Sequence, residues 1–141
     1  MAINFDIIKT PTGFLKTCEI VITIIILSVG QGVVKSIYGS AERIFVVGGA
    51  CVLSIVTSTL LLISYIIGDT QIQKTRFEFL VNVCLALLMI TAGSLIINSY
   101  TVYDVYISDV TDAALAVGSF GIINSIFYAL DAYFAYQNFS E

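Results

Sequence analysis

The chain has 141 residues, of which 58% are hydrophobic and only 11% are charged, and its formal net charge is −4. A typical soluble domain carries about a quarter charged residues, and one of this size leaves roughly a third of its chain surface in water. The composition therefore excludes a soluble domain and predicts an integral membrane protein. The acidic balance argues against a nucleic-acid partner, because no basic patch is available to neutralise phosphates.

Four continuous apolar stretches occur at residues 14–34, 44–67, 77–97 and 113–136. Each reaches the roughly 20 residues that a helix needs to cross the hydrocarbon core. No water satisfies backbone groups in lipid, so continuous runs of this length are expected to be helices. The short connections favour antiparallel neighbours. The sequence thus predicts an all-α fold, an up-down bundle of four transmembrane helices forming one domain over residues 1–141.

The first stretch begins with basic and acidic residues, Lys16 and Glu19, on either side of Cys18. It is expected to be a retained helix, because its apolar part is long and no convincing small-x-small cleavage site follows it. Cys18 lies at the predicted inner membrane boundary, where cytoplasmic acyl transfer reaches cysteines. Two interpretations remain open for Cys18: an acylation site, or a small apolar residue that packs.

Small residues recur at intervals of three or four on the second and fourth stretches. Such spacing lets helix backbones approach each other in lipid. Packing within one bundle and a homo-oligomer face are both open interpretations. Asn82 and Asn124 are further candidates, for hydrogen bonds between helices. The small residues predicted to pack are Ala50, Ser54, Ser58, Gly118, Gly121, Ser125 and Ala129.

The last connection, "NSYTVYDVYISDVTD", carries a tyrosine every third residue, Tyr100, Tyr103 and Tyr106. An aromatic belt at the membrane interface is one interpretation. The other is a contact surface for a partner protein or a second membrane, because loop aromatics make good contact anchors.

Asp131 stands in an otherwise apolar and aromatic stretch, "IFYALDAYFAY". It lies about 7 Å inside the predicted inner end of the last span, at a depth similar to that of Glu19. A carboxylate in hydrocarbon is costly, so both are expected to face the bundle and to bind a polar partner. The candidate partners are Lys16, Lys74, Arg76 and Tyr128. The alternative interpretation is a proton or cation relay.

The basic residues flanking the spans predict the orientation. Short loops on the cytoplasmic side of a membrane carry an excess of Lys and Arg, so both termini are expected to be cytoplasmic. One side carries Lys9, Lys16, Lys74 and Arg76, and the other carries Lys35 and Arg43.

The order of these motifs resembles that of MARVEL-domain proteins. "GFLKTCEIVI" opens the first span, "LLLISYIIGD" closes the second, and "DAALAVGSFGIINSIFYALDAYFAY" forms the fourth. The compact length is similar to that of the MAL (myelin and lymphocyte) proteolipid branch or a small invertebrate relative. The resemblance implies a four-helix protein of the plasma membrane or of vesicles, with cytoplasmic ends, acting in membrane organisation, vesicle traffic or cell junctions.

No residue pattern typical of catalysis is present, since the chain has no His, no nucleophile elbow and no phosphate-binding loop. We therefore expect no enzyme activity, cofactor or metal. The predicted function is organisation of membranes through helix packing and contacts with lipids and other membrane proteins, with homo-oligomers an open alternative. The competing hypothesis is an accessory subunit of a channel or transporter, or a small pore.

Overall fold

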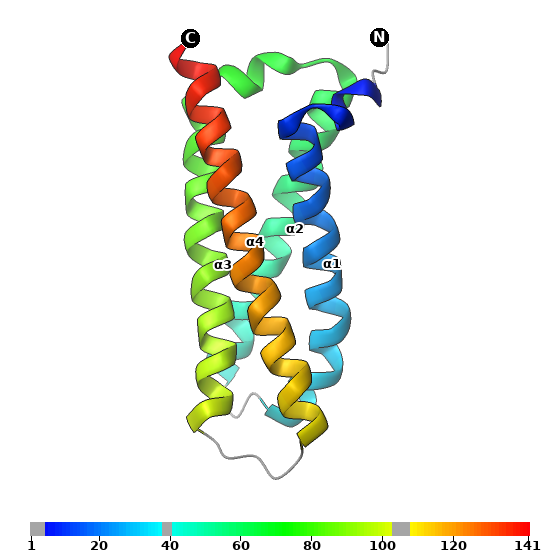
Figure 1. Ribbon diagram of the computed structural model, residues 1–141, viewed down its shortest axis with the longest axis vertical. Helices are drawn as coiled ribbons and strands as arrows, with labels where there is room; N and C mark the ends of the chain where they lie inside the picture. The colour runs from blue at the N-terminus through cyan, green and yellow to red at the C-terminus, as the bar shows by residue number, and fades with distance from the viewer. Residues whose placement is uncertain (1–4, 38–40, 103–107) are drawn as a thin grey trace.

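Four long α-helices make up most of the structure, a computed structural model that describes residues 5–37, 41–102 and 108–141, without the side chains of residues 31–37, 70, 100–102 and 108–111. Two short 3-10 helices lie outside the bundle helices at the end that holds both termini (Figure 1). The elements in chain order are η1 (Phe5–Lys9), α1 (Pro11–Ile37), α2 (Ala41–Ile67), η2 (Thr70–Lys74), α3 (Arg76–Val102) and α4 (Ser108–Ser140).

The predicted all-α bundle of four spans is confirmed, since each long helix is apolar enough to cross a membrane. Each predicted span lies within one helix, but the helices continue beyond it: α1 reaches Ile37 and α4 begins at Ser108. The apolar pattern marks only the part of a helix that lies in hydrocarbon. Polar end residues such as Glu42 and Arg43 are good helix formers and continue the helix at the interface.

The start of α1 is fixed by three neighbouring residues. Pro11 occupies the first helical position, where its missing N–H and fixed φ carry no penalty. The Thr10 hydroxyl accepts a hydrogen bond from the Gly13 backbone N–H at 3.3 Å, which caps one free donor of the first turn. A Cβ at Gly13 would overlap the carbonyl oxygen of Ile7. Glycine at this position therefore lets η1 fold back against α1.

The end of α2 is a Schellman motif. Gly68 has a φ of +98°, a left-handed conformation that favours glycine. Its N–H donates to the Tyr65 carbonyl, and the Asp69 N–H donates to the Ser64 carbonyl, each at 3.0 Å. These bonds satisfy carbonyls at the helix end and turn the chain toward η2.

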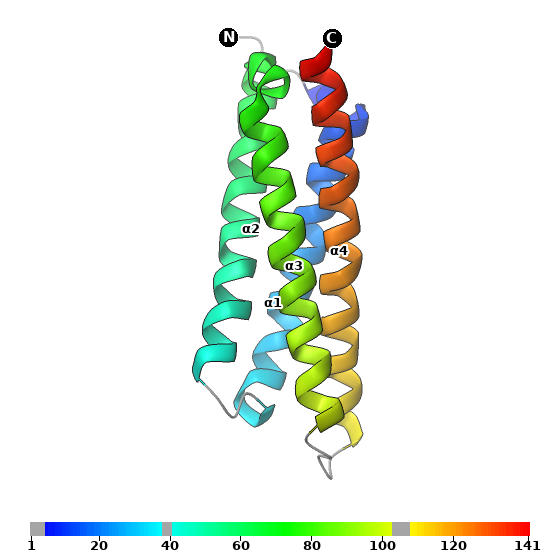
Figure 2. The ribbon, with the colours of Figure 1, turned by 90° about the vertical axis from the view of Figure 1, so that its left-hand side faces the viewer.

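The helices form a ring in which the backbone of each packs mainly against two neighbours. α4 packs against α3 and α1, and α2 packs against α1 and α3. Figures 1 and 2 show the four helices running side by side along the long axis, and in Figure 1 α4 lies between α1 and α3. Sequence neighbours run in opposite directions, as the short connections predict.

α3 and α4 approach each other closely at Gly93, Gly118 and Gly121. A Cβ at Gly93 would lie 2.7 Å from the Gly118 carbonyl oxygen, and a Cβ at Gly121 would lie 3.1 Å from the Gly93 Cα. The backbones can meet here only because these positions lack side chains, which is how small residues promote helix packing in lipid.

Large apolar side chains cover the outside of the bundle. Exposed examples come from every helix, including Val21 on α1, Phe45 on α2, Leu87 on α3 and Ile126 on α4. Fully buried positions, by contrast, include several charged and hydroxyl-bearing side chains. Polar groups inside and apolar groups outside are the arrangement expected of a bundle surrounded by lipid.

Candidate functional site

A polar cluster lies inside the bundle, in the half nearer the termini. Its members come from all four helices, and every one of them is buried. We call this set the buried polar cluster. It consists of Lys16, Glu19 and Thr23 on α1, Ser54 and Ser58 on α2, Asn82 on α3, and Asn124, Tyr128 and Asp131 on α4.

Lys16 is the centre of the cluster. Its side chain is 0% exposed, and its Nζ lies 2.5 Å from Asp131 Oδ2 and 3.1 Å from Glu19 Oε2. Nζ also donates to Asn82 Oδ1 at 2.7 Å. Nζ thus donates hydrogen bonds to Glu19 and Asn82 and forms an ion pair with Asp131. Lys16 therefore joins α1, α3 and α4 through one atom.

The spacing of Lys16 and Glu19 explains why both reach the same place. Residues three apart share one face of a helix, and this face of α1 points into the bundle. The ring of Tyr128 lies 5.4 Å from Lys16 Nζ and adds a cation–π contact. A buried charge requires partners of this kind, because an uncompensated one would be costly in hydrocarbon.

A chain of hydroxyl groups continues from Glu19 toward the middle of the bundle. Ser58 donates to Glu19 Oε2 at 2.9 Å and contacts the Tyr128 hydroxyl at 2.7 Å. Tyr128 contacts Ser54 at 2.5 Å, and Ser54 contacts Thr23 at 3.2 Å. The last hydroxyl of this series, on Thr23, donates to the Glu19 carbonyl oxygen at 2.7 Å. Asn124 joins it by donating to the Thr23 hydroxyl at 3.0 Å.

The number of hydrogens that the linked hydroxyl groups supply indicates whether the Glu19 carboxyl is charged. The hydroxyls of Thr23, Ser54, Ser58 and Tyr128 supply four hydrogens, whereas the contacts just described between hydroxyl, carboxyl and carbonyl oxygens need five. A proton on the Glu19 carboxyl, donated to the Ser58 oxygen in place of the bond that Ser58 donates to an ionised Glu19, would supply the fifth. In that arrangement Lys16 and Asp131 form one neutral ion pair, and no net charge is left in the buried polar cluster.

A second buried contact lies beside the cluster, between α2 and α3. The Tyr65 hydroxyl donates to Glu78 Oε1, and both side chains are buried. Neither residue was predicted from the sequence to belong to a site. The signal was available, because Glu78 follows the start of the third apolar stretch directly, and an acid inside a span requires a partner.

The predicted inner-leaflet carboxylates, Glu19 and Asp131, lie together and face the bundle interior. Of their candidate partners, Lys16 binds both and Tyr128 joins them through the hydroxyl chain. Lys74 and Arg76 are exposed at the end of the bundle and do not contribute. Because Lys16 is buried in an ion pair, the basic residues that bear on the predicted orientation are three against two rather than four against two.

Most of the predicted small packing residues are buried, but Ala129 is an exception. Ala50, Ser54 and Ser58 on α2, and Gly118, Gly121 and Ser125 on α4, lie inside, whereas Ala129 is exposed. Its assignment to a packing ridge within this bundle was therefore wrong. Each four-residue step advances about 40° around a helix of 3.6 residues per turn, so the 121–125–129 ridge turns out of the interface. Ala132, three residues further, returns to it. Gly93 and Thr23, which also lie inside the bundle, were not predicted from the sequence.

The structure describes the side chains of all three cysteines but not those of the three loop tyrosines. Cys18 is half-buried, Cys51 is buried and Cys84 is exposed. The side chain of Tyr100 lies outside the described part of the structure, as do Tyr103 and Tyr106 altogether. Within the described residues, no group of His, Cys, Asp and Glu side chains could hold a metal ion.

These features define a class: a multi-pass membrane protein whose bundle encloses a polar cluster and presents apolar side chains to lipid. The sequence profile of the MARVEL family, described as a membrane-associating domain, matches residues 7–134. The chain therefore belongs to the MARVEL family, as the order of its motifs predicted. Searches of curated proteins and of solved structures returned no match.

Proposed function

We propose that the protein is not an enzyme and that it organises membrane microdomains, vesicle traffic or cell junctions through helix packing and through contacts with lipids and other membrane proteins. The family supports the coarser part of this function, since its domain is membrane-associating. The finer part rests on how the bundle divides its polar and apolar side chains.

The main support for the proposal is an apolar layer inside the bundle, on the side of the buried polar cluster that faces away from the termini. Beyond Thr23 and Asn124, a layer of apolar side chains that pack against one another fills the interior, and the next buried polar residue of the described chain is Ser99 near the other end of the bundle. A proton or ion path needs polar groups across the whole membrane, and this layer interrupts such a path. The layer includes Ile26, Val47, Cys51, Ala92, Ile96, Ala114 and Val117.

The buried polar cluster is then best explained as a clasp that fixes how the helices pack. Lys16 binds groups on α3 and α4 as well as on its own helix, and the hydroxyl chain adds α2. A buried polar network that joins several helices favours one helix register over others. A fixed bundle presents a constant outer surface to lipids and partners, which is what an organising protein needs.

The test is reconstitution of the purified full chain into bilayers. In planar bilayers we expect no selective conductance above that of protein-free membranes. In giant vesicles that contain two coexisting lipid phases, we expect the labelled protein to concentrate in one phase and to change the distribution of a labelled lipid.

Steady, selective conductance would support the competing hypothesis of a small pore and contradict this proposal. A uniform protein distribution, with lipid distribution unchanged from that of protein-free vesicles, would contradict it as well. An accessory subunit would be silent alone and would alter conductance only with its channel present.

The cytoplasmic location of both termini remains part of the proposal. Both ends of the described chain lie at one end of the bundle (Figure 1), which an even number of spans requires. Lys9, Lys74 and Arg76 belong to this end, and positive residues favour the cytoplasmic side. We further propose the plasma membrane or vesicles as the location. Homo-oligomers are an additional proposal.

A further inference from the structure

An apolar groove runs along the outside of the bundle between α3 and α4. Its volume is about 360 Å³, within the range of roughly 300–1,000 Å³ that ligand sites occupy. Alanines leave the space open and aromatic rings border it. The alanines are Ala86, Ala129 and Ala132, and the rings are Phe79, Tyr133 and Tyr136.

A positive charge lies at the end of this groove nearest the termini. The Arg76 guanidinium lies 6.0 Å from the centre of the Phe139 ring. Phe139 in turn contacts two of the bordering rings, Phe79 at 5.9 Å and Tyr136 at 5.1 Å between centroids. The Arg76 guanidinium is therefore linked to the groove wall through the Phe139 ring.

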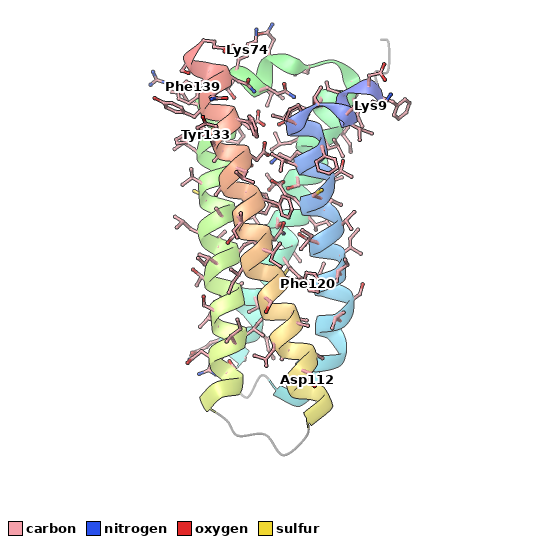
Figure 3. All side chains as sticks on the ribbon, in the orientation of Figure 1. Lys9, Lys74, Asp112, Phe120, Tyr133 and Phe139 are labelled. Carbon is pink, nitrogen blue, oxygen red and sulfur yellow. The ribbon has the colours of Figure 1, made fainter. Side chains whose placement is uncertain are left out.

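A second cation lies at the same level. Figure 3 shows Lys74, Phe139 and Tyr133 together at the end of the bundle that carries the termini. Lys74 and Arg76 are both exposed, and within the described part of the chain neither forms an ion pair. Two exposed cations beside aromatic rings mark the level of lipid headgroups.

The distances along α3 fit a molecule with a charged head and an apolar tail. Phe79 lies about 4.5 Å, and Leu87 about 16 Å, further along the helix than Arg76. The charge thus stands at the mouth, and the groove extends away from it into the level of the hydrocarbon. An acyl chain would lie against the alanines while a phosphate accepts hydrogen bonds from the guanidinium.

We propose that this groove binds an anionic glycerophospholipid, with its phosphate at Arg76 and one acyl chain over Ala129. The proposal deepens the lipid contacts of the proposed function and rests on that function only for its biological meaning. Charge complementarity favours this occupant over a second copy of the chain. In a twofold-symmetric dimer through the groove the same patch faces itself, which would bring the Arg76 and Lys74 side chains of both copies together.

Lipid binding to the purified full chain in detergent tests the proposal. Native mass spectrometry would measure the affinity for phosphatidylglycerol and for phosphatidylcholine with identical acyl chains. We expect phosphatidylglycerol to bind at least about fivefold more tightly, the contribution of one basic residue at an anionic surface. Arg76→Gln should remove that preference, and Ala129→Leu, which fills the groove, should weaken binding of both lipids.

Matched substitutions control for charge and for size. Lys9→Gln removes one exposed cation from the same end of the protein but outside the groove, and Ala116→Leu enlarges an exposed alanine elsewhere on α4. Both should bind lipid as the wild type does. Because all four altered residues are exposed, circular dichroism should report unchanged helix content.

Equal affinity for the two lipids in the wild type would overturn the proposal. A phosphatidylglycerol preference that survives Arg76→Gln would overturn it too. So would an Ala129→Leu variant that no longer dimerises but binds both lipids as tightly as the wild type. Tight, Arg76-dependent binding supports the groove even if vesicle lipids are not redistributed, in which case only the proposed organising function fails. Redistribution without such binding would overturn the groove alone.

Discussion

Replacing the two carboxyls beside Lys16 one at a time tests how charge is balanced inside the bundle. Asp131→Leu removes the acceptor 2.5 Å from Nζ, and breaking a buried ion pair costs about 3–5 kcal/mol. We expect the lower end of that range, about 3 kcal/mol. Glu19 remains 3.1 Å from Nζ and can lose its proton to become the new counter-charge.

Asp131→Asn should cost less than Asp131→Leu. An amide oxygen keeps a polar group beside Nζ and can accept a hydrogen bond from it, so only the charge is lost, and the expected cost is about 1–3 kcal/mol. Glu19→Gln should cost least, about 1 kcal/mol or less. A glutamine amide can donate to Ser58 as a protonated carboxyl would, and it leaves the pair of Lys16 and Asp131 intact.

Thermal unfolding of the four proteins in one detergent measures this order: wild type, Glu19→Gln, Asp131→Asn, Asp131→Leu, from most to least stable. Glu42→Gln is the control, because it removes an exposed carboxylate from α2. Asp131→Leu at or above the stability of the wild type would refute a stabilising ion pair. Glu19→Gln ranking below Asp131→Asn would refute the assignment of the negative charge to Asp131.

Three further predictions concern packing, acylation and orientation. Gly93→Ala should destabilise the bundle by about 1–3 kcal/mol, because its Cβ would press on the Gly118 carbonyl, whereas Gly48→Ala has open space around it and should be neutral or slightly stabilising in thermal unfolding. Cys18→Ser should abolish acyl-exchange labelling while Cys84→Ser leaves it intact, because Cys18 is predicted to lie at the inner boundary. Tags at the two termini should resist protease in intact cells and be digested only after permeabilisation, because basic residues favour the cytoplasmic side.

Each of these predictions has a clear contrary outcome. Equal stability of the Gly93→Ala and Gly48→Ala variants would show that α3 and α4 do not approach closely at Gly93. Labelling that persists in Cys18→Ser would remove acylation at this cysteine. A terminal tag digested from outside intact cells would reverse the proposed orientation.

The fold could be predicted from the sequence because lipid permits few solutions. A continuous apolar stretch in hydrocarbon must satisfy its own backbone, so the four spans follow from length alone. The common depth of Glu19 and Asp131 likewise predicted that they would share one layer. Depth in a membrane is almost a one-dimensional quantity, and counting residues from a helix end measures it.

The partners were harder to predict because they depend on rotation about the helix axes. Lys16 was one of four candidates, and the sequence did not rank it above Lys74 and Arg76. Small rotations accumulate along a helix, which is why the predicted ridge failed at Ala129. The approach at Gly93 depends on α3 and α4 together, so the spacing within either helix alone could not reveal it.

The position of the ion pair has a consequence for how the protein is made. Lys16 and Asp131 are 115 residues apart in the chain, and at 5–20 residues per second the ribosome needs about 6 to 23 seconds to pass from one to the other. During that interval α1 holds an ammonium and a carboxyl without their partner on α4. A lysine within a span opposes insertion on its own. We therefore expect the translocon, or a chaperone beside it, to hold the first helix until the last arrives.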